Sequence, residues 1–214
     1  MKSREENEHS LNLHPTHLAD LRKSELSGET IRQAGIYSCP PRDINKKLGF
    51  NDPKIESLLC FPYPGCDGFE RFKPFPSLEG KPKYLQKKDT GNHLYIPNKV
   101  RPILSDVSIP ITLTEGEKKT LKAVQEGLFC TGVSGWWNWK NKGSDELISD
   151  FDLIRLDGRK IILIPDNDWQ SLSNHGYGKN IKQAIYRLSK KLIERGARVF
   201  IKELPAGAMR RQWR

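Results

Sequence analysis

The sequence predicts an α/β protein in which a parallel sheet of about four strands follows a small α+β region. The prediction depends on two short apolar runs that each lead into carboxylates, residues 111–115 and 160–168. Between them, residues 117–126 have apolar side chains at helical spacing and end at Gly127. A strand, a helix and a further strand form the crossover unit of a parallel sheet.

The other elements of this sheet follow from apolar spacing. Residues 129–133 predict the strand that completes the first crossover. A clear amphipathic helix carries Ile181, Ile185 and Leu188 on one face and ends at Gly196. Residues 198–204 then predict a fourth strand.

Composition divides the chain into four expected regions. They are an N-terminal helical region (1–57), a small basic β-rich subdomain (58–103), the parallel-sheet domain (104–205) and a basic tail (206–214). In the first region, Ser27 is a predicted helix N-cap and Asp43 begins a short helix that ends at Gly49. His14 and His17 lack further metal ligands nearby, so we expect solvated surface histidines.

The β-rich subdomain alternates short aromatic runs with proline, glycine and lysine. Lys73, Lys83 and Lys87 among these aromatics would suit a single-stranded nucleic-acid groove, where bases stack on rings and phosphates pair with ammonium groups. The alternative is a half-buried sheet whose aromatic side chains are core and whose lysines face water. Both interpretations remain open from the sequence.

The charge of the chain favours a polyanionic partner. There are 36 Lys and Arg against 26 Asp and Glu, a formal net charge of +10. Because no basic amphipathic helix with a large apolar face and no membrane-spanning apolar run is apparent, nucleic acid is expected rather than a membrane. The polar first ten residues are no signal peptide, and the four cysteines form no Cys-x-x-Cys pair, which predicts a reducing cytoplasm.

Three carboxylates are expected at one edge of the sheet. All strands of a parallel sheet end on the same edge, so Glu115 would meet Asp166 and Asp168 there. The two aspartates are two residues apart and point to the same side in extended geometry. Three carboxylates repel one another, and Mg²⁺ or Mn²⁺ bound through their oxygens would offset that repulsion.

The residues around Glu115 have structural explanations as well. Thr114 and Glu117 have the spacing of a capping box, so Glu117 is expected to cap the helix rather than bind a ligand. Lys118 and Lys119 lie in the first helical turn, where the helix dipole disfavours cations. A phosphate or the carboxylate cluster should therefore lie close to these lysines.

The Thr-Glu-Gly-Glu-Lys-Lys stretch at 114–119, followed by a strand that ends in Asp-x-Asp, resembles the Toprim domain of topoisomerases and primases. It is most similar to a Toprim-like group in phage and plasmid replication proteins, best over residues 104–204. The resemblance implies Mg²⁺-dependent phosphoryl transfer on nucleic acid by a primase-like component, with single-stranded DNA and a replicative helicase as partners. By the same resemblance, Glu115 serves acid–base or metal-positioning work, Asp166 and Asp168 hold the metal, and Lys118 and Lys119 contact phosphate.

The chain departs from that group after residue 204, because a Lys-Gly and paired-aspartate segment is expected there and is absent from the sequence. The resemblance therefore implies a domain shortened at its C-terminus, which would bind metal and single-stranded DNA but synthesise primers poorly. Three alternatives stay open. They are a Toprim nuclease, a non-catalytic nucleic-acid-binding or regulatory module, and a fold whose acids are only caps and turn residues.

Three tryptophans follow the second predicted strand, Trp136, Trp137 and Trp139. They could stack on bases or clamp their loop onto the sheet. Packing is the commoner role of tryptophan, so we expect at least two of the three to be buried.

Overall fold

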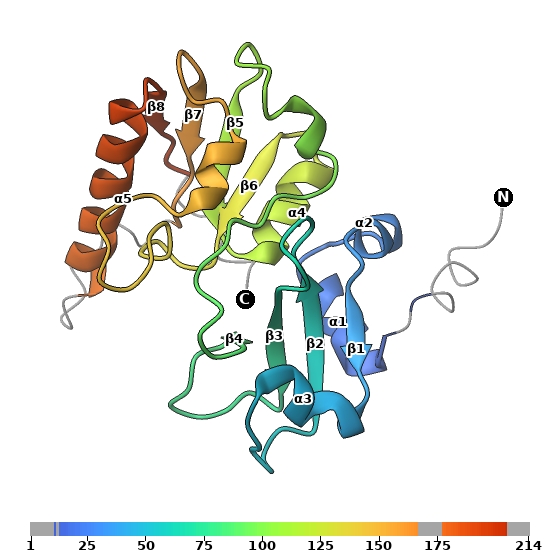
Figure 1. The fold of residues 1–214 in the computed structure, drawn as a ribbon. Coiled ribbons are helices and arrows are strands. Elements are labelled where there is room, and N and C mark those ends of the chain that lie inside the picture. Colours follow the sequence, from blue (N-terminus) through green and yellow to red (C-terminus); the bar gives the residue numbers. More distant parts are fainter. Residues whose placement is uncertain (1–10, 12, 167–176, 205–214) are drawn as a thin grey trace, which may run out of the picture. The chain divides into compact units, whose positions relative to one another are not determined.

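The computed structural model describes residues 11, 13–166 and 177–204. The chain forms two compact units, Met1–Gly91 and Asn92–Arg214. The first contains an antiparallel four-stranded sheet with helices, and the second a parallel four-stranded sheet with flanking helices (Figure 1). The predicted α/β class, with an α+β region before the parallel sheet, is confirmed.

The N-terminal unit is built on strands in the order β1-β2-β3-β4, each antiparallel to its neighbour. The strands are β1 (Tyr37–Cys39), β2 (Ser57–Pro62), β3 (Glu70–Phe75) and β4 (Leu85–Gln86). The helices are α1 (Pro15–Arg22), α2 (Gly28–Gln33), the 3₁₀ helix η1 (Pro41–Asp43) and α3 (Ile44–Leu48). Strand β1 belongs to the helical segment, between α2 and η1, and pairs with β2 of the β-rich segment. The two segments therefore form one unit.

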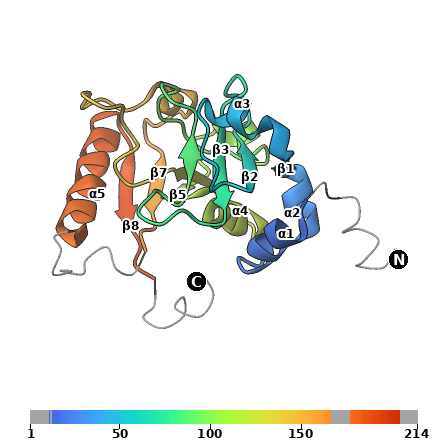
Figure 2. The same cartoon turned by 90° about the horizontal axis from the view of Figure 1, so that it is seen from below.

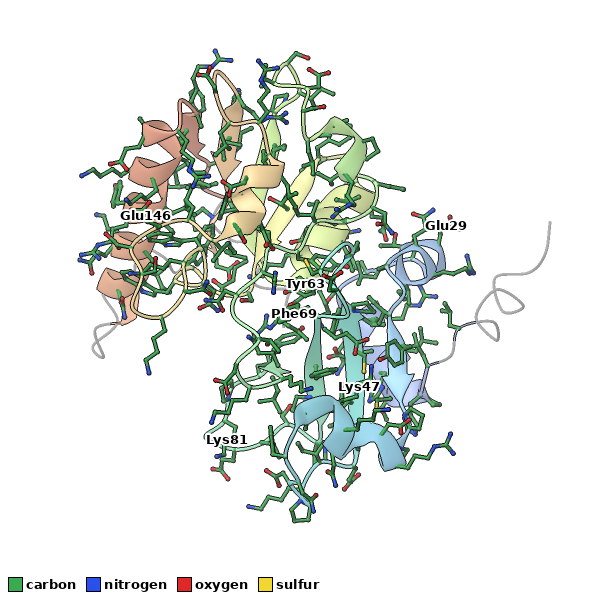
Figure 3. The ribbon with its side chains drawn as sticks, viewed as in Figure 1. Glu29, Lys47, Tyr63, Phe69, Lys81 and Glu146 are labelled. Atoms are coloured by element: carbon green, nitrogen blue, oxygen red, sulfur yellow. The ribbon has the colours of Figure 1, made fainter. Side chains whose placement is uncertain are left out.

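Local signals in this unit are mostly confirmed. The Ser27 hydroxyl accepts a hydrogen bond from the Thr30 N–H at 3.1 Å and caps α2. Gly49 ends α3 with φ = 77°, in the left-handed region that glycine tolerates. Asp43 precedes α3 but its side chain makes no capping hydrogen bond. At the turn between β2 and β3, the rings of Tyr63 and Phe69 pack edge to face, with centroids 4.8 Å apart (Figure 3).

The C-terminal unit is built on a sheet in which every neighbouring pair is parallel, in the order β6-β5-β7-β8. Its strands are β5 (Ile111–Glu115), β6 (Cys130–Val133), β7 (Lys160–Leu163) and β8 (Arg198–Ile201). Its helices are η2 (Arg101–Ile103), α4 (Glu117–Gln125), η3 (Ser149–Leu153) and α5 (Tyr177–Glu194). Figure 2 shows α5 beside β8, with β7 and β5 following across the sheet.

The core of the C-terminal unit lies under α5. The buried side chains of Ile185 and Leu188 share one cluster with Leu113 and Leu163 of the strands. Trp136 and Trp139 are 4% and 0% exposed in this cluster, and Trp137 packs against it. The prediction that at least two of the three tryptophans pack is therefore confirmed.

The other face of the sheet carries α4 over β5 and β6. Val133 faces the α5 core, so its neighbour Gly132 faces the opposite side. There, a Cβ atom at Gly132 would stand 2.3 Å from the Thr120 hydroxyl. Only glycine lets the helix approach the strand this closely. Beyond β6, Tyr95 adds an antiparallel bridge to Gly132.

A buried arginine closes the loop before β5. Arg159 is 0% exposed, and its guanidinium donates to the carbonyls of Ile103, Leu104 and Ile109 at 2.9–3.1 Å. Its Nε donates to the Arg155 carbonyl at 2.8 Å. These hydrogen bonds satisfy carbonyl groups that no strand pairing reaches. They also hold the segment before β5 against the residue that precedes β7. Among the described helices, none is long and apolar enough to cross a membrane.

Candidate functional site

The strand order reverses between β5 and β7. From β5 the chain passes through α4 to β6 on one side, and from β7 it passes through α5 to β8 on the other. At such a topological switch point the two connections leave in opposite directions and open a crevice beyond the carboxyl ends of the strands. Ligands of open α/β sheets bind in this crevice.

Two of the three predicted carboxylates lie at this switch point. Leu113 pairs with Leu163, and the Ile164 N–H donates to the Leu113 carbonyl at 2.9 Å. The strands therefore stay side by side up to Thr114, whose hydroxyl donates to the Ile164 carbonyl at 3.1 Å. Glu115 is the last residue of β5, and Asp166 follows β7. Asp168 lies outside the described residues.

The backbone after Glu115 turns sharply at Gly116. This residue has φ = 89° and ψ = 152°, a conformation that is essentially restricted to glycine. Its N–H donates to the Val133 carbonyl at 2.8 Å, and its carbonyl accepts from the Thr120 hydroxyl at 2.8 Å. The Glu115–Gly116 turn is thus held by β6 on one side and by α4 on the other.

The predicted capping box is wrong. Gly116 is the N-cap of α4 and provides no side chain, while the Thr114 hydroxyl is bonded to Ile164 instead. Glu117 begins the helix and is 1% exposed. Burial raises the pKa of Tyr95, and the negative charge of Glu117 raises it further. Glu117 is therefore an interior carboxylate close to a buried phenol, rather than a surface cap.

Lys119 joins the two crossover units at the switch point. Its ammonium Nζ lies 2.5 Å from the Asp166 Oδ1 atom, so the first turn of α4 is tied to the end of β7. The side chains are 26% and 45% exposed, respectively, which leaves both accessible from solvent. The negative charge expected near the lysines of this turn is thus provided by Asp166. Lys118 is half-buried in the same turn.

The donor atoms at this edge suit a hard divalent cation. Glu115 and Asp166 offer carboxylate oxygens from neighbouring strands, as Mg²⁺ and Mn²⁺ prefer. Lys119 competes for the same oxygens of Asp166. A bound cation would therefore have to displace this ammonium or share the carboxylate with it.

The basic residues predicted in the β-rich subdomain separate into two groups. Lys73 is 6% exposed, and its Nζ lies 2.5 Å from Asp20 Oδ1, so its ammonium is not available to a phosphate. Lys83 and Lys87 are exposed. Phe61 and Phe72 are core residues at 0% and 2% exposure. For these two rings, burial in the interior of the sheet is therefore favoured and stacking on bases is not.

A histidine that the sequence placed on the surface is buried. His17 is 0% exposed, its Nδ1 lies 2.7 Å from Ser38 Oγ, and its Nε2 lies 2.9 Å from Ser57 Oγ. Burial lowers the pKa of His17 to about 4. Both serines line an open hollow of about 780 Å³. The missed signal was the four-residue spacing from His17 to Leu21, which places both on one helical face.

One comparison with known proteins finds a match. A family model described as "Domain of unknown function (DUF3854)" matches residues 101–210, slightly more than half of the chain. No curated protein matches the chain, and no solved structure does. The matched region contains the whole parallel sheet with the switch point.

Proposed function

The chain belongs to the DUF3854 family, and from this premise we propose that its parallel-sheet unit carries out metal-dependent phosphoryl transfer on nucleic acid. In this proposal the protein is a primase-like component of phage or plasmid DNA replication. The observation that supports it best is that Glu115 ends β5 and Asp166 follows the end of β7, the two strands that flank the switch point. The carboxyl edge at a switch point is where open α/β sheets bind ligands.

The arrangement of elements also supports the resemblance to Toprim domains. The Thr-Glu-Gly-Glu stretch spans the end of β5 and the start of α4, and the Asp-x-Asp stretch follows the neighbouring parallel strand. The glycine between the two glutamates adopts a conformation that other residues avoid. Among the described motif residues, Glu115 ends β5, Glu117 starts α4 and Asp166 follows β7, so these positions are determined by the fold itself.

In the proposed reaction, Glu115 and Asp166, together with Asp168, would hold Mg²⁺ or Mn²⁺ at the carboxyl edge. The cation would orient phosphate oxygens and stabilise charge that develops on them. Lys119 keeps Asp166 in place before the metal binds, because its ammonium already neutralises that carboxylate. With Asp166 shared with a cation, Lys119 and the neighbouring Lys118 in the first turn of α4 would contact a phosphate group.

A non-catalytic nucleic-acid-binding module is the second candidate, and the Lys119–Asp166 ion pair favours it. A paired carboxylate needs no cation to offset its charge. The two candidates make opposite predictions about divalent cations, because only the catalytic site requires one.

Metal binding provides the direct test. Titration of the full chain with Mn²⁺ in a calorimeter should give one site whose affinity falls in Glu115→Gln and in Asp166→Asn. Glu126→Gln is the matched control, since Glu126 is an exposed carboxylate at the other end of α4 that pairs with Lys122. Equal Mn²⁺ affinity in all four proteins would reject the metal site.

Activity is tested separately, with labelled nucleotides, single-stranded template and Mg²⁺ or Mn²⁺. Primer synthesis that is lost in Glu115→Gln and kept in Glu126→Gln supports the primase-like function. Cleavage of the template with the same dependence on Glu115 supports the nuclease alternative. Binding of Mn²⁺ without either reaction would reject catalysis by this chain alone.

A further inference from the structure

Part of the parallel sheet presents a basic and aromatic face instead of an apolar one. Ile161 and Val199 face the α5 core, so the alternate residues Lys160, Arg198 and Phe200 face the other way. Lys160 pairs with Arg198 across the two strands, and the Lys160 ammonium lies 4.9 Å from the centre of the Phe200 ring. These contacts place the three side chains together on one face.

This face extends toward the carboxyl edge. The Lys202 N–H donates to the Leu163 carbonyl at 2.8 Å, so the extended backbone of β8 continues by one residue. By the same alternation, Lys202 follows Phe200 on this face and is exposed. We call the set Lys160, Arg198, Phe200 and Lys202 the β7–β8 strip.

The strip is accessible in the part of the chain that the structure describes. Helix α4 packs over β5 and β6 on this face of the sheet, and α5 packs on the opposite face. Phe200 is 49% exposed, although it stands in a strand of the sheet. An exposed aromatic ring thus stands among three cations, on strands that carry no acidic residue, and this combination offers both a stacking surface and positive charge to one ligand.

We propose that the β7–β8 strip binds single-stranded nucleic acid, with a base stacked on Phe200 and phosphates paired with Lys160, Arg198 and Lys202. The inference deepens the proposed function and rests on it, because the strip would guide the strand to the carboxyl edge where transfer takes place. Lys202 stands at that edge, beside the end of β7 that leads to Asp166.

Charge complementarity selects this occupant over two others. Residues 205–214 contain Arg210, Arg211 and Arg214 and no acidic residue, so their charge has the same sign as that of the strip. A second copy of the chain, docked strip to strip, would also oppose like charges. A polyanion with stackable bases satisfies both the cations and the ring.

The test measures binding of a fluorescent oligothymidine to the full chain by anisotropy, across a range of salt concentrations and with EDTA present. Phe200→Ala should weaken binding about fivefold or more, since stacking on one aromatic ring is lost. Phe200→Trp should keep the affinity. Lys160→Gln with Lys202→Gln should reduce the slope of log affinity against log salt by about 1.4, at about 0.7 for each phosphate contact.

The matched controls lie on α5, where the Lys182 ammonium stands 5.9 Å from the centre of the exposed Tyr186 ring. Tyr186→Ala, and separately Lys182→Gln with Lys190→Gln, remove the same chemistry elsewhere and should leave affinity and slope nearly unchanged. Equal losses in the α5 variants, or no loss in the strip variants, would overturn the proposal. A change of oligomeric state in Phe200→Ala, measured by sedimentation, would assign the strip to self-association and overturn it too.

Asp166→Asn separates this proposal from the proposed function. Because EDTA removes divalent cations, the variant should bind oligothymidine like the parent even if its metal affinity is lost. If the full chain binds no Mn²⁺ but the strip variants still lose oligothymidine affinity, the catalytic function is rejected and the proposal for the strip stands. If Phe200→Trp binds oligothymidine as weakly as Phe200→Ala, base stacking on this side chain is rejected.

Discussion

Replacing Gly132 by alanine tests the contact between α4 and β6 on which the Glu115–Gly116 turn depends. The added Cβ would stand 2.3 Å from the Thr120 hydroxyl, a distance that requires Thr120 to move. Thr120 is 0% exposed, β-branched and bonded through this hydroxyl to the Gly116 carbonyl. It therefore has little freedom to rotate away within the helix.

The magnitude follows from three contributions. Overpacking at a buried site costs about 1–3 kcal/mol. Loss of the Thr120–Gly116 hydrogen bond costs about 1 kcal/mol. Alanine returns about 0.4–1 kcal/mol, because it reduces the freedom of the unfolded chain. We expect Gly132→Ala to lower the free energy of unfolding by about 2 kcal/mol.

Urea unfolding monitored by circular dichroism measures this change. The double variant with Thr120→Ala removes the hydroxyl and leaves the nearest Thr120 atom, its Cβ, at 3.4 Å. It should therefore be more stable than the sum of the two single changes predicts, by about 1 kcal/mol or more. Gly28→Ala is the matched control, since its new Cβ meets nothing closer than 3.8 Å.

Two results would refute this reasoning. The first is an unfolding free energy of Gly132→Ala equal to that of the parent, which would mean that helix and strand are not in close contact. The second is strict additivity in the double variant, which would mean that the hydroxyl of Thr120 is not what the new methyl group meets.

Three further changes have defined outcomes. Lys119→Met should raise Mn²⁺ affinity in calorimetry, because the ammonium no longer competes for Asp166, and should cost at most about 1 kcal/mol of stability for a half-exposed ion pair. As the pH falls from 6.5 to about 4, the unfolding free energy should fall by up to about 1.4 kcal/mol per pH unit, because the unfolded chain takes up a proton that buried His17 does not. Urea titrations at several pH values should show that this dependence of the unfolding free energy on pH is weaker in His17→Asn. Arg159→Lys should lower the unfolding free energy by on the order of 3 kcal/mol in urea titration, since lysine cannot reproduce the planar set of donors that reaches four carbonyls.

The parallel sheet could be predicted from the sequence because its signals are local. Short apolar runs lead to Glu115 and Asp166, and apolar spacing marks both crossover helices. The handedness and order of crossovers are restricted by general rules, so strand ends meet at one edge once the elements are known. The position of the candidate site therefore follows from the local apolar pattern together with the general rules for crossovers.

Other features depend on partners far away in the sequence. Thr114 and Glu117 have the spacing of a capping box, but the Thr114 hydroxyl is bonded to Ile164 on the neighbouring strand. Lys73 appears in the sequence as one more lysine in a basic segment, yet Asp20 of α1 pairs with it in the interior. Neither contact leaves a trace in local spacing, because hydrogen bonds and ion pairs between distant segments have no sequence period.

The reversal of strand order at the switch point has a consequence for how the unit folds. The β5–α4–β6 crossover joins strands whose paired residues, such as Thr112 and Cys130, are about 18 positions apart, so it can form early with a small loss of chain entropy. The β7–α5–β8 crossover closes a longer span, from Lys160 to Arg198. The β5–β7 pairing joins segments about 50 residues apart and should form late, in the manner of non-local contacts. Glu115 belongs to one crossover and Asp166 to the other. The two proposed metal ligands therefore come to the same edge of the sheet only when the β5–β7 pairing closes, so partly folded chains would lack the proposed metal site.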